Sequence, residues 1–158
     1  MAAATPARIP AFYRLIFLWL EPISILAGAI YAHFLTSTYL DLTHKPTAPG
    51  ASVPVSTQIV MTQLANLYLG LAILEASVLR ATSDVKVWRT FITGLLIADF
   101  GHLYSVAPLG SSIYFAYGRW NSIDWGNIPF VYFLAIVRSL FLLGVGFEEQ
   151  RGVRSKLT

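Results

Sequence analysis

Cysteine is absent from this chain of 158 residues, which excludes disulfide bonds, thiolate catalysis and cysteine-ligated metals. Histidine is scarce as well. His33, His44 and His102 stand too far apart for a zinc or haem signature, so we expect neither a metal nor another cofactor. The chain also lacks a glycine-rich phosphate loop and a stripe of basic residues, which argues against partners such as nucleotides and nucleic acids.

Charged residues make up only 12% of the chain, whereas hydrophobic residues make up 56% and aromatic residues 14%. The mean hydropathy is +0.62. A soluble domain of this size leaves roughly a third of its unfolded surface exposed after folding, so it could not hide this much apolar area. The composition therefore predicts an integral membrane protein.

Four apolar stretches reach the ~20 residues that a helix needs to cross the hydrocarbon core of a membrane. They lack the alternation of membrane strands, which leaves helices as the spanning elements. The first stretch is too long for a signal-peptide core, so we expect it to be retained. The sequence thus predicts an all-α membrane protein with one domain over residues 1–158, a four-helix transmembrane bundle of residues 12–35, 57–79, 88–109 and 128–147.

Lysine and arginine are distributed unevenly near the ends of these spans, and the side that is rich in them normally faces the cytosol. Only Lys45 and Arg119 fall on one side of the membrane. The side of the two termini holds Arg8, Arg14, Arg80, Lys86, Arg89, Arg151, Arg154 and Lys156. This bias predicts that both termini are cytosolic.

Ionisable side chains also lie well inside all four spans, away from the residues at their ends, and these are Glu21, Glu75, Asp99, His102 and Arg138. At about 1.5 Å of rise per residue, all five fall between the cytosolic interface and just past the middle of the membrane. A closed bundle would bring them together as one layer. Each charged group near the middle of a span costs about 2.5–3.5 kcal/mol on insertion, so such residues usually mark a functional site.

The charge balance of this layer predicts acid–base chemistry. Three carboxyl groups and one arginine would leave a buried net charge of −2 if all were ionised, and burial and like-charge repulsion both disfavour that state. We expect Asp99 to be ionised beside Arg138, and Glu21, or less readily the shallower Glu75, to hold a proton. An ionised and a protonated carboxyl group in one dry site can act as a base and an acid.

The sequence around Glu21 predicts how this carboxyl group is aimed. Glu21 shares its helical face with Ser24 and Gly28, and small residues of this kind are typical of contacts between helices. Pro22 leaves the carbonyl of Leu18 without its helical N–H donor, which predicts a kink beside the carboxylate.

Four further side chains are candidates for substrate contacts. Tyr68 lies seven residues before Glu75 and shares its helical face, whereas Asn66 lies on the opposite face, where packing is the alternative role. Tyr104 and Trp19 either shape a pocket or face lipid.

A purely structural interpretation of the layer is also open. The pair of Asp99 and Arg138 would then fix the register of two helices, while the long side chains of Glu21 and Glu75 reach the interface. His102 would form a hydrogen bond with a backbone carbonyl.

Three segments resemble a known group of proteins: "IPAFYRLIFLWLEPISILAGAIYAHF", "LEASVLR" and "ADFGHLYS". They are similar to small fungal membrane proteins of secondary-metabolite pathways, among them the membrane epoxide hydrolases and cyclases of aurovertin- and citreoviridin-type polyene biosynthesis. The resemblance covers residues 9–147. It implies regioselective opening of a polyene bis-epoxide by water or by an internal hydroxyl group, in the membrane of the endoplasmic reticulum. A more distant similarity links the chain to fungal membrane terpene cyclases, which are longer.

Epoxide opening needs a general acid at the epoxide oxygen and a general base at the attacking oxygen. We expect Asp99 as the base, with Arg138 as its orienting partner, and Glu21 as the acid. Glu75 is the alternative acid. His102 would donate a hydrogen bond or relay the proton.

The expected substrate is a lipophilic polyketide or terpenoid intermediate, with hydrolysis and cyclisation both open. The other expected partners are membrane lipids, and a homo-oligomer is left open.

Two other classes of function stay in consideration. A membrane isomerase or sterol-type binding bundle would use the same acids around a carbocation or a cationic amphiphile. A non-catalytic scaffold would have a filled core, with no cavity between its helices.

Overall fold

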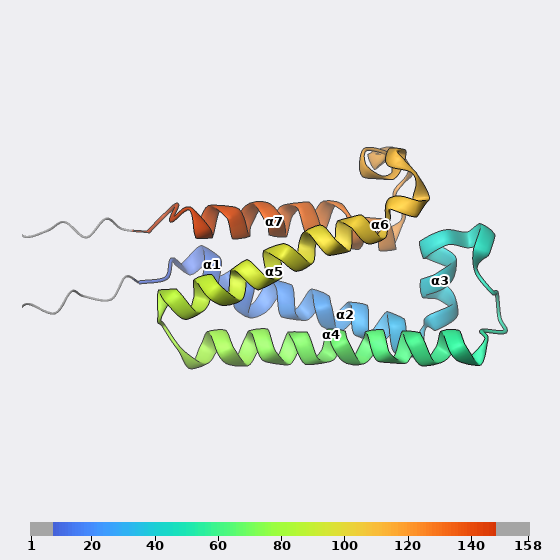
Figure 1. Cartoon of the computed structure of the whole chain (residues 1–158), viewed down its shortest axis with the longest axis horizontal. Helices are drawn as coiled ribbons and strands as arrows, with labels where there is room; N and C mark the ends of the chain where they lie inside the picture. Colours follow the sequence, from blue (N-terminus) through green and yellow to red (C-terminus); the bar gives the residue numbers. More distant parts are fainter. Residues whose placement is uncertain (1–7, 148–158) are drawn as a thin grey trace, which may run out of the picture.

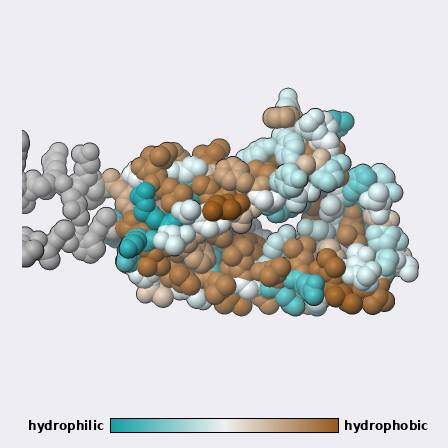
Figure 2. All heavy atoms as spheres, viewed as in Figure 1, coloured by the Kyte–Doolittle hydropathy of each residue, from teal (hydrophilic) through white to brown (hydrophobic). Residues whose placement is uncertain are grey.

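The computed structural model describes residues 8–147, and all regular structure within that range is helical. Four helical segments are long and apolar enough to cross a membrane, namely Ala11–Phe34, Val55–Ala81, Val85–Leu109 and Ser122–Leu142. The prediction of an all-α membrane protein with four spans is therefore confirmed. Figure 2 shows the corresponding surface, with apolar residues over most of the length of the helices, where a membrane would supply hydrocarbon contacts.

The first span consists of three helical pieces that follow one another without a break: α1 (Ala11–Leu15), the wide turn η1 (Ile16–Leu20) and α2 (Glu21–Phe34). In η1, the N–H of Glu21 donates to the carbonyl of Ile16, five residues earlier instead of four. Such wide turns are rare and often accompany functional sites. The expected irregularity beside Glu21 is thus present, and its form is a π-turn.

The four spans associate as two pairs. Helix α2 packs along α4 (Val55–Ala81), and α5 (Val85–Ser105) packs along α7 (Pro129–Leu142). Figure 1 shows that α5 leaves the short turn after α4 and diverges from α4 toward the opposite end of the molecule. There, α3 (Thr36–His44) contacts α6 (Ser122–Asn127). Short 3₁₀ turns connect the spans at this end, at Lys45–Thr47, Ala107–Leu109, Ser111–Tyr114 and Tyr117–Arg119.

The boundaries of the first three spans lie within three residues of the predicted ones, whereas both boundaries of the fourth span differ by more, and local chemistry explains these two. The fourth span begins at Ser122 because Asn121 and Asp124 form a capping box, in which each side chain accepts a hydrogen bond from the other residue's backbone N–H. The same span ends at Leu142 instead of residue 147. Gly144 and Gly146 follow with φ of 81° and 78°, a left-handed conformation that ends helices and favours glycine.

Both ends of the described chain lie at the same end of the bundle as the turn between α4 and α5 (Figure 1). Arg14, Arg80, Lys86 and Arg89 belong to this end, and the segments with Lys45 and Arg119 lie at the other. The separation of charge expected from the sequence is therefore present in three dimensions. Arg151, Arg154 and Lys156 lie outside the described residues.

The apolar core is densest near the termini. A cluster there joins the first span with α4, α5 and α7 and consists of Ile9, Tyr13, Ile16, Phe17, Leu18, Leu79, Trp88, Ile92, Leu95, Leu134, Val137 and Phe141. Its centre is aromatic, with the Phe17 and Trp88 rings 5.9 and 6.0 Å from Phe141. A second cluster, Ala32, Met61 and Ala65, involves only the α2–α4 pair and its α3 neighbours. Glu21, Asp99 and Arg138 each follow a member of the first cluster by about one helical turn or less.

Candidate functional site

Arg138 is the centre of the candidate site. One terminal nitrogen of its guanidinium donates a hydrogen bond to Asp99 Oδ2, and the other donates to Glu21 Oε1. The three side chains come from α7, α5 and α2, and each is almost completely buried. Arg138 therefore compensates two carboxylates at once, in an environment that excludes water. The sequence predicted only the pair with Asp99.

Glu75 on α4 supplies the third carboxyl group of the layer. It is fully buried and lies next to the carboxyl group of Glu21. Within the described part of the chain, neither Glu75 oxygen has a hydrogen-bond partner. The alternative in which Glu75 extends to the membrane interface is therefore not the observed arrangement. Of the two glutamates, Glu21 is bound by the arginine and Glu75 is not.

Buried polar atoms without partners are concentrated in this layer. Between residues 8 and 147 there are five such side-chain atoms, and they belong to Glu21, Glu75, His102 and Arg138. Folded proteins satisfy nearly all buried polar groups, so each exception needs an explanation. All five exceptions lie on side chains of the predicted charged layer.

His102 lies at the edge of the layer, one turn beyond Asp99 on α5. Its side chain is close to those of Asp99 and Asn127, and its Nε2 is buried without a partner among the residues described. Of the three acids, Asp99 is the one that lies near His102. The structural alternative, a bond from this ring to a backbone carbonyl, is not found there.

Tyr68 faces the interior between α2 and α4. A Cβ atom at Gly28 would lie 3.4 Å from the Tyr68 ring, so the glycine lets this side chain pack closely against α2. Tyr68 also neighbours Tyr39 on α3, outside the spans. Burial raises the pKa of Tyr39 above its ordinary value, and the nearby Tyr68 hydroxyl group raises it further.

Three of the predicted substrate contacts are not brought to the layer. Tyr104 and Trp19 are 79% and 57% exposed, and Asn66 is exposed on the outer face of α4. The position of Tyr104 could have been anticipated, since five residues place it about 140° around the helix from Asp99. Trp19 instead packs with Arg80, whose guanidinium lies 4.7 Å from the centre of its ring.

Sequence reasoning missed Arg80 as a neighbour of the site. Arg80 Nη2 donates a 2.6 Å hydrogen bond to the carbonyl of Leu18, the group that Pro22 leaves without a helical donor. The signal was available in principle, because a carbonyl freed inside a membrane needs another donor. Arg80 lies in the last turn of α4, which packs against η1.

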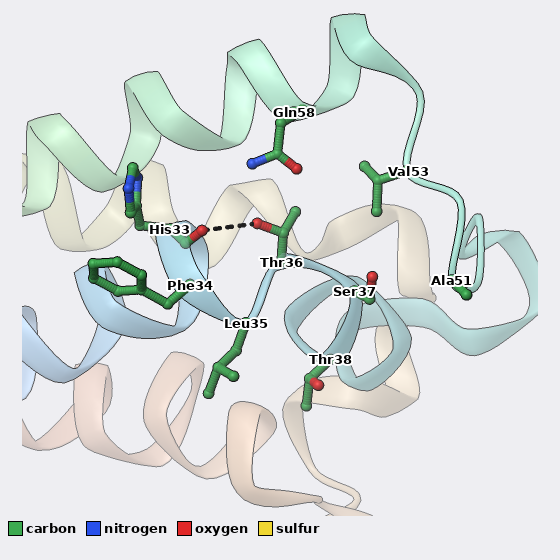
Figure 3. A pocket seen from close by; sticks show the side chains of 9 residues that line it. All are labelled: His33, Phe34, Leu35, Thr36, Ser37, Thr38, Ala51, Val53 and Gln58. Atoms are coloured by element: carbon green, nitrogen blue, oxygen red, sulfur yellow. Dashed lines mark hydrogen bonds between the residues drawn. The ribbon is translucent and has the colours of Figure 1, made fainter.

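Two hollows lie elsewhere on the molecule. The larger, about 530 Å³, is open and lies where α2, α3 and the start of α4 meet. Figure 3 shows Gln58 extending from α4 toward Thr36, whose hydroxyl group donates to the carbonyl of His33 at 3.3 Å. The smaller is lined by Lys86, Val87, Thr90 and Phe91. Neither hollow includes a residue of the charged layer.

The chain belongs to the family described as a domain of unknown function (DUF7704), which matches residues 6–148. Neither a curated protein nor a solved structure matches the chain. Among the residues that the structure describes, no group of three or more His, Cys, Asp or Glu side chains could hold a metal ion. The resemblance to fungal membrane epoxide hydrolases and cyclases is not tested by these matches and stays a prediction.

Proposed function

We propose that this protein opens an epoxide in a lipophilic polyketide or terpenoid intermediate, by acid–base catalysis within the membrane and without a cofactor. One observation supports this proposal above the others. A third carboxyl group, Glu75, is buried beside an arginine that two other carboxylates already occupy. A buried carboxyl group that lacks a cation is most stable when it carries a proton, and a protonated acid is what epoxide opening requires.

Our proposal assigns the roles of the two glutamates differently from the expectation based on the sequence. Glu75 takes the role of the general acid and gives its proton to the epoxide oxygen as the bond from carbon to that oxygen breaks. Water, or a hydroxyl group of the substrate, forms the new bond to the same carbon and releases its proton to Asp99. Arg138 orients Asp99 and keeps Glu21 ionised, and return of the proton from Asp99 to Glu75 completes the cycle. His102 is placed to relay that proton.

The resemblance stated for the sequence supports the choice of an epoxide and the endoplasmic reticulum as the membrane. The choice between hydrolysis and cyclisation depends on which oxygen attacks. An isomerase or sterol-type bundle would use the same acids, but it would bind cationic amphiphiles tightly in the absence of any epoxide.

The test is turnover of a lipophilic polyene epoxide by the full-length protein in detergent. Glu75→Gln and Asp99→Asn keep the shapes of the side chains and remove the acid and the base. Asp124→Asn is a matched control, since Asp124 is also a buried carboxylate but only caps α6. We expect product from the wild type and the control alone. Full activity of Asp99→Asn would refute the assigned roles.

A structural layer is the second candidate, and one observation favours it. Arg138 is bonded on both sides, and neither of the two hollows described above includes it. In this case Arg138 would hold α2, α5 and α7 in register. For every variant in the layer, any loss of epoxide turnover would then be matched by an equal loss of folded protein.

A further inference from the structure

The contact between Arg80 and Leu18 joins the two helices that carry Glu75 and Glu21. The π-turn η1 and Pro22 together disturb the backbone hydrogen bonds just before Glu21. In a regular helix the N–H of residue 22 would donate to the carbonyl of Leu18, and proline has no N–H. Arg80 Nη2 provides the missing donor at 2.6 Å.

The ring of Trp19 supports the arginine in this position. The guanidinium carbon of Arg80 lies 4.7 Å from the centre of the indole ring, a cation–π distance. One side of the guanidinium thus rests on a side chain of η1 and one nitrogen binds the backbone of η1. Arg80 therefore holds the irregular turn at two points.

The spacing along each helix connects this contact with the acids. Leu18 lies three residues before Glu21, and Arg80 lies five residues after Glu75. The contact thus fixes the backbone of η1 against the last turns of α4, directly beside the place where the two carboxyl groups meet. The interaction between a protonated carboxyl group and a neighbouring carboxylate depends strongly on the distance between them.

We propose that Arg80 is a positioning residue for the carboxyl pair of Glu21 and Glu75, acting through the carbonyl of Leu18. It does not touch the reacting atoms. This inference rests on the proposed function, because it assumes that Glu75 holds a proton beside the Glu21 carboxylate. It adds that the π-turn and Pro22 are tolerated because an arginine of the neighbouring helix replaces the lost donor.

Arg89 offers a matched control on the same side of the membrane. Its Nη2 also donates to a backbone carbonyl of another helix, that of Leu142 at the end of α7. This contact joins α5 to α7, and Glu21 and Glu75 are on neither helix. Removing Arg89 therefore removes a comparable hydrogen bond that involves neither η1 nor a helix that carries Glu21 or Glu75.

The test is infrared spectroscopy of the full-length protein in detergent at pH 7, in the region where protonated carboxylic acids absorb. We expect a band in the wild type that Glu75→Gln removes. In Arg80→Met the band should shift in frequency, because η1 and its Glu21 carboxylate are no longer held at a fixed distance from Glu75. Arg80→Lys should retain the wild-type frequency, and Arg89→Met should leave the band unchanged.

Pro22→Ala provides a second test that does not require Arg80→Met to be stable alone. Alanine restores an N–H that can bind the carbonyl of Leu18, so in the Pro22→Ala background the change of Arg80 to Met should no longer shift the band. A shift of equal size in both backgrounds would overturn the positioning role. So would a band that Arg80→Met and Arg89→Met affect equally. A wild type without the band would overturn the proposed function together with this inference.

Discussion

Replacing Arg138 by methionine should destabilise the protein by about 3–5 kcal/mol, the usual cost of leaving a buried charge without its partner. The structure places this side chain between Asp99 and Glu21, and all three are buried. Methionine fills a similar volume but donates no hydrogen bond. Two carboxylates would then face each other in a dry layer, and their repulsion adds to the loss of the two ion pairs.

The cost should largely disappear when the charges are removed together. In the triple variant with Arg138→Met, Glu21→Gln and Asp99→Asn, no ionised group of this cluster is left without a partner, so we expect most of the stability to return. Acidification should have a similar effect on Arg138→Met alone, because protonation neutralises the two carboxyl groups.

Unfolding in mixed micelles with increasing amounts of sodium dodecyl sulfate, followed by far-ultraviolet circular dichroism, measures these differences. Arg138→Lys serves as the control, since it keeps the charge but cannot bind both carboxylates in the same geometry, and it should lie between wild type and Arg138→Met. If Arg138→Met unfolded at the wild-type midpoint, the ion pairs would be irrelevant to stability and the reasoning would be refuted.

Three other predictions concern the rest of the fold. Asn121→Ala should lower the free energy of unfolding by about 1–2 kcal/mol in the same assay, since Asn121 caps α6 and binds α3 through a 2.8 Å hydrogen bond. Because the pKa of Tyr39 is raised in the folded state, stability should be constant below the ordinary tyrosine pKa of 10.0 and fall as the pH rises above it. Between pH values below and above 10.0, the free energy of unfolding should fall less for Tyr39→Phe than for the wild type. The chain lacks cysteine, so a single cysteine at Ser83 should react with a membrane-impermeant reagent from the cytosolic side, and one at Ser111 only from the other.

The four spans could be predicted from the sequence because length and apolar composition decide whether a helix crosses a membrane. The charged layer could be predicted for the same reason, since Glu21, Asp99 and Arg138 stand out within apolar segments and depth follows from counting residues. The ends of the fourth span were missed. Asn121 and Asp124 have the spacing of a capping box, which indicates a helix start before the apolar run begins. Gly144 and Gly146 end the helix although the residues around them are apolar.

The connections within the layer could not be predicted from the sequence. Counting residues places Arg138 at the right depth, but the direction in which each terminal nitrogen points depends on how far α5 and α7 stand from α2. The π-turn just before Glu21 was also not predicted. The structure pairs Glu21, and not Glu75, with Arg138.

The central claim is that the layer is an acid–base site, and Glu75→Gln tests it most directly when activity and stability are measured on the same preparation. Glu75 has no hydrogen-bond partner in the part of the chain that the structure describes, so the amide should leave the protein at least as stable as the wild type. The account predicts a stable variant that no longer turns over a lipophilic polyene epoxide. A variant with wild-type turnover would contradict the account, and so would a large loss of stability in parallel with activity.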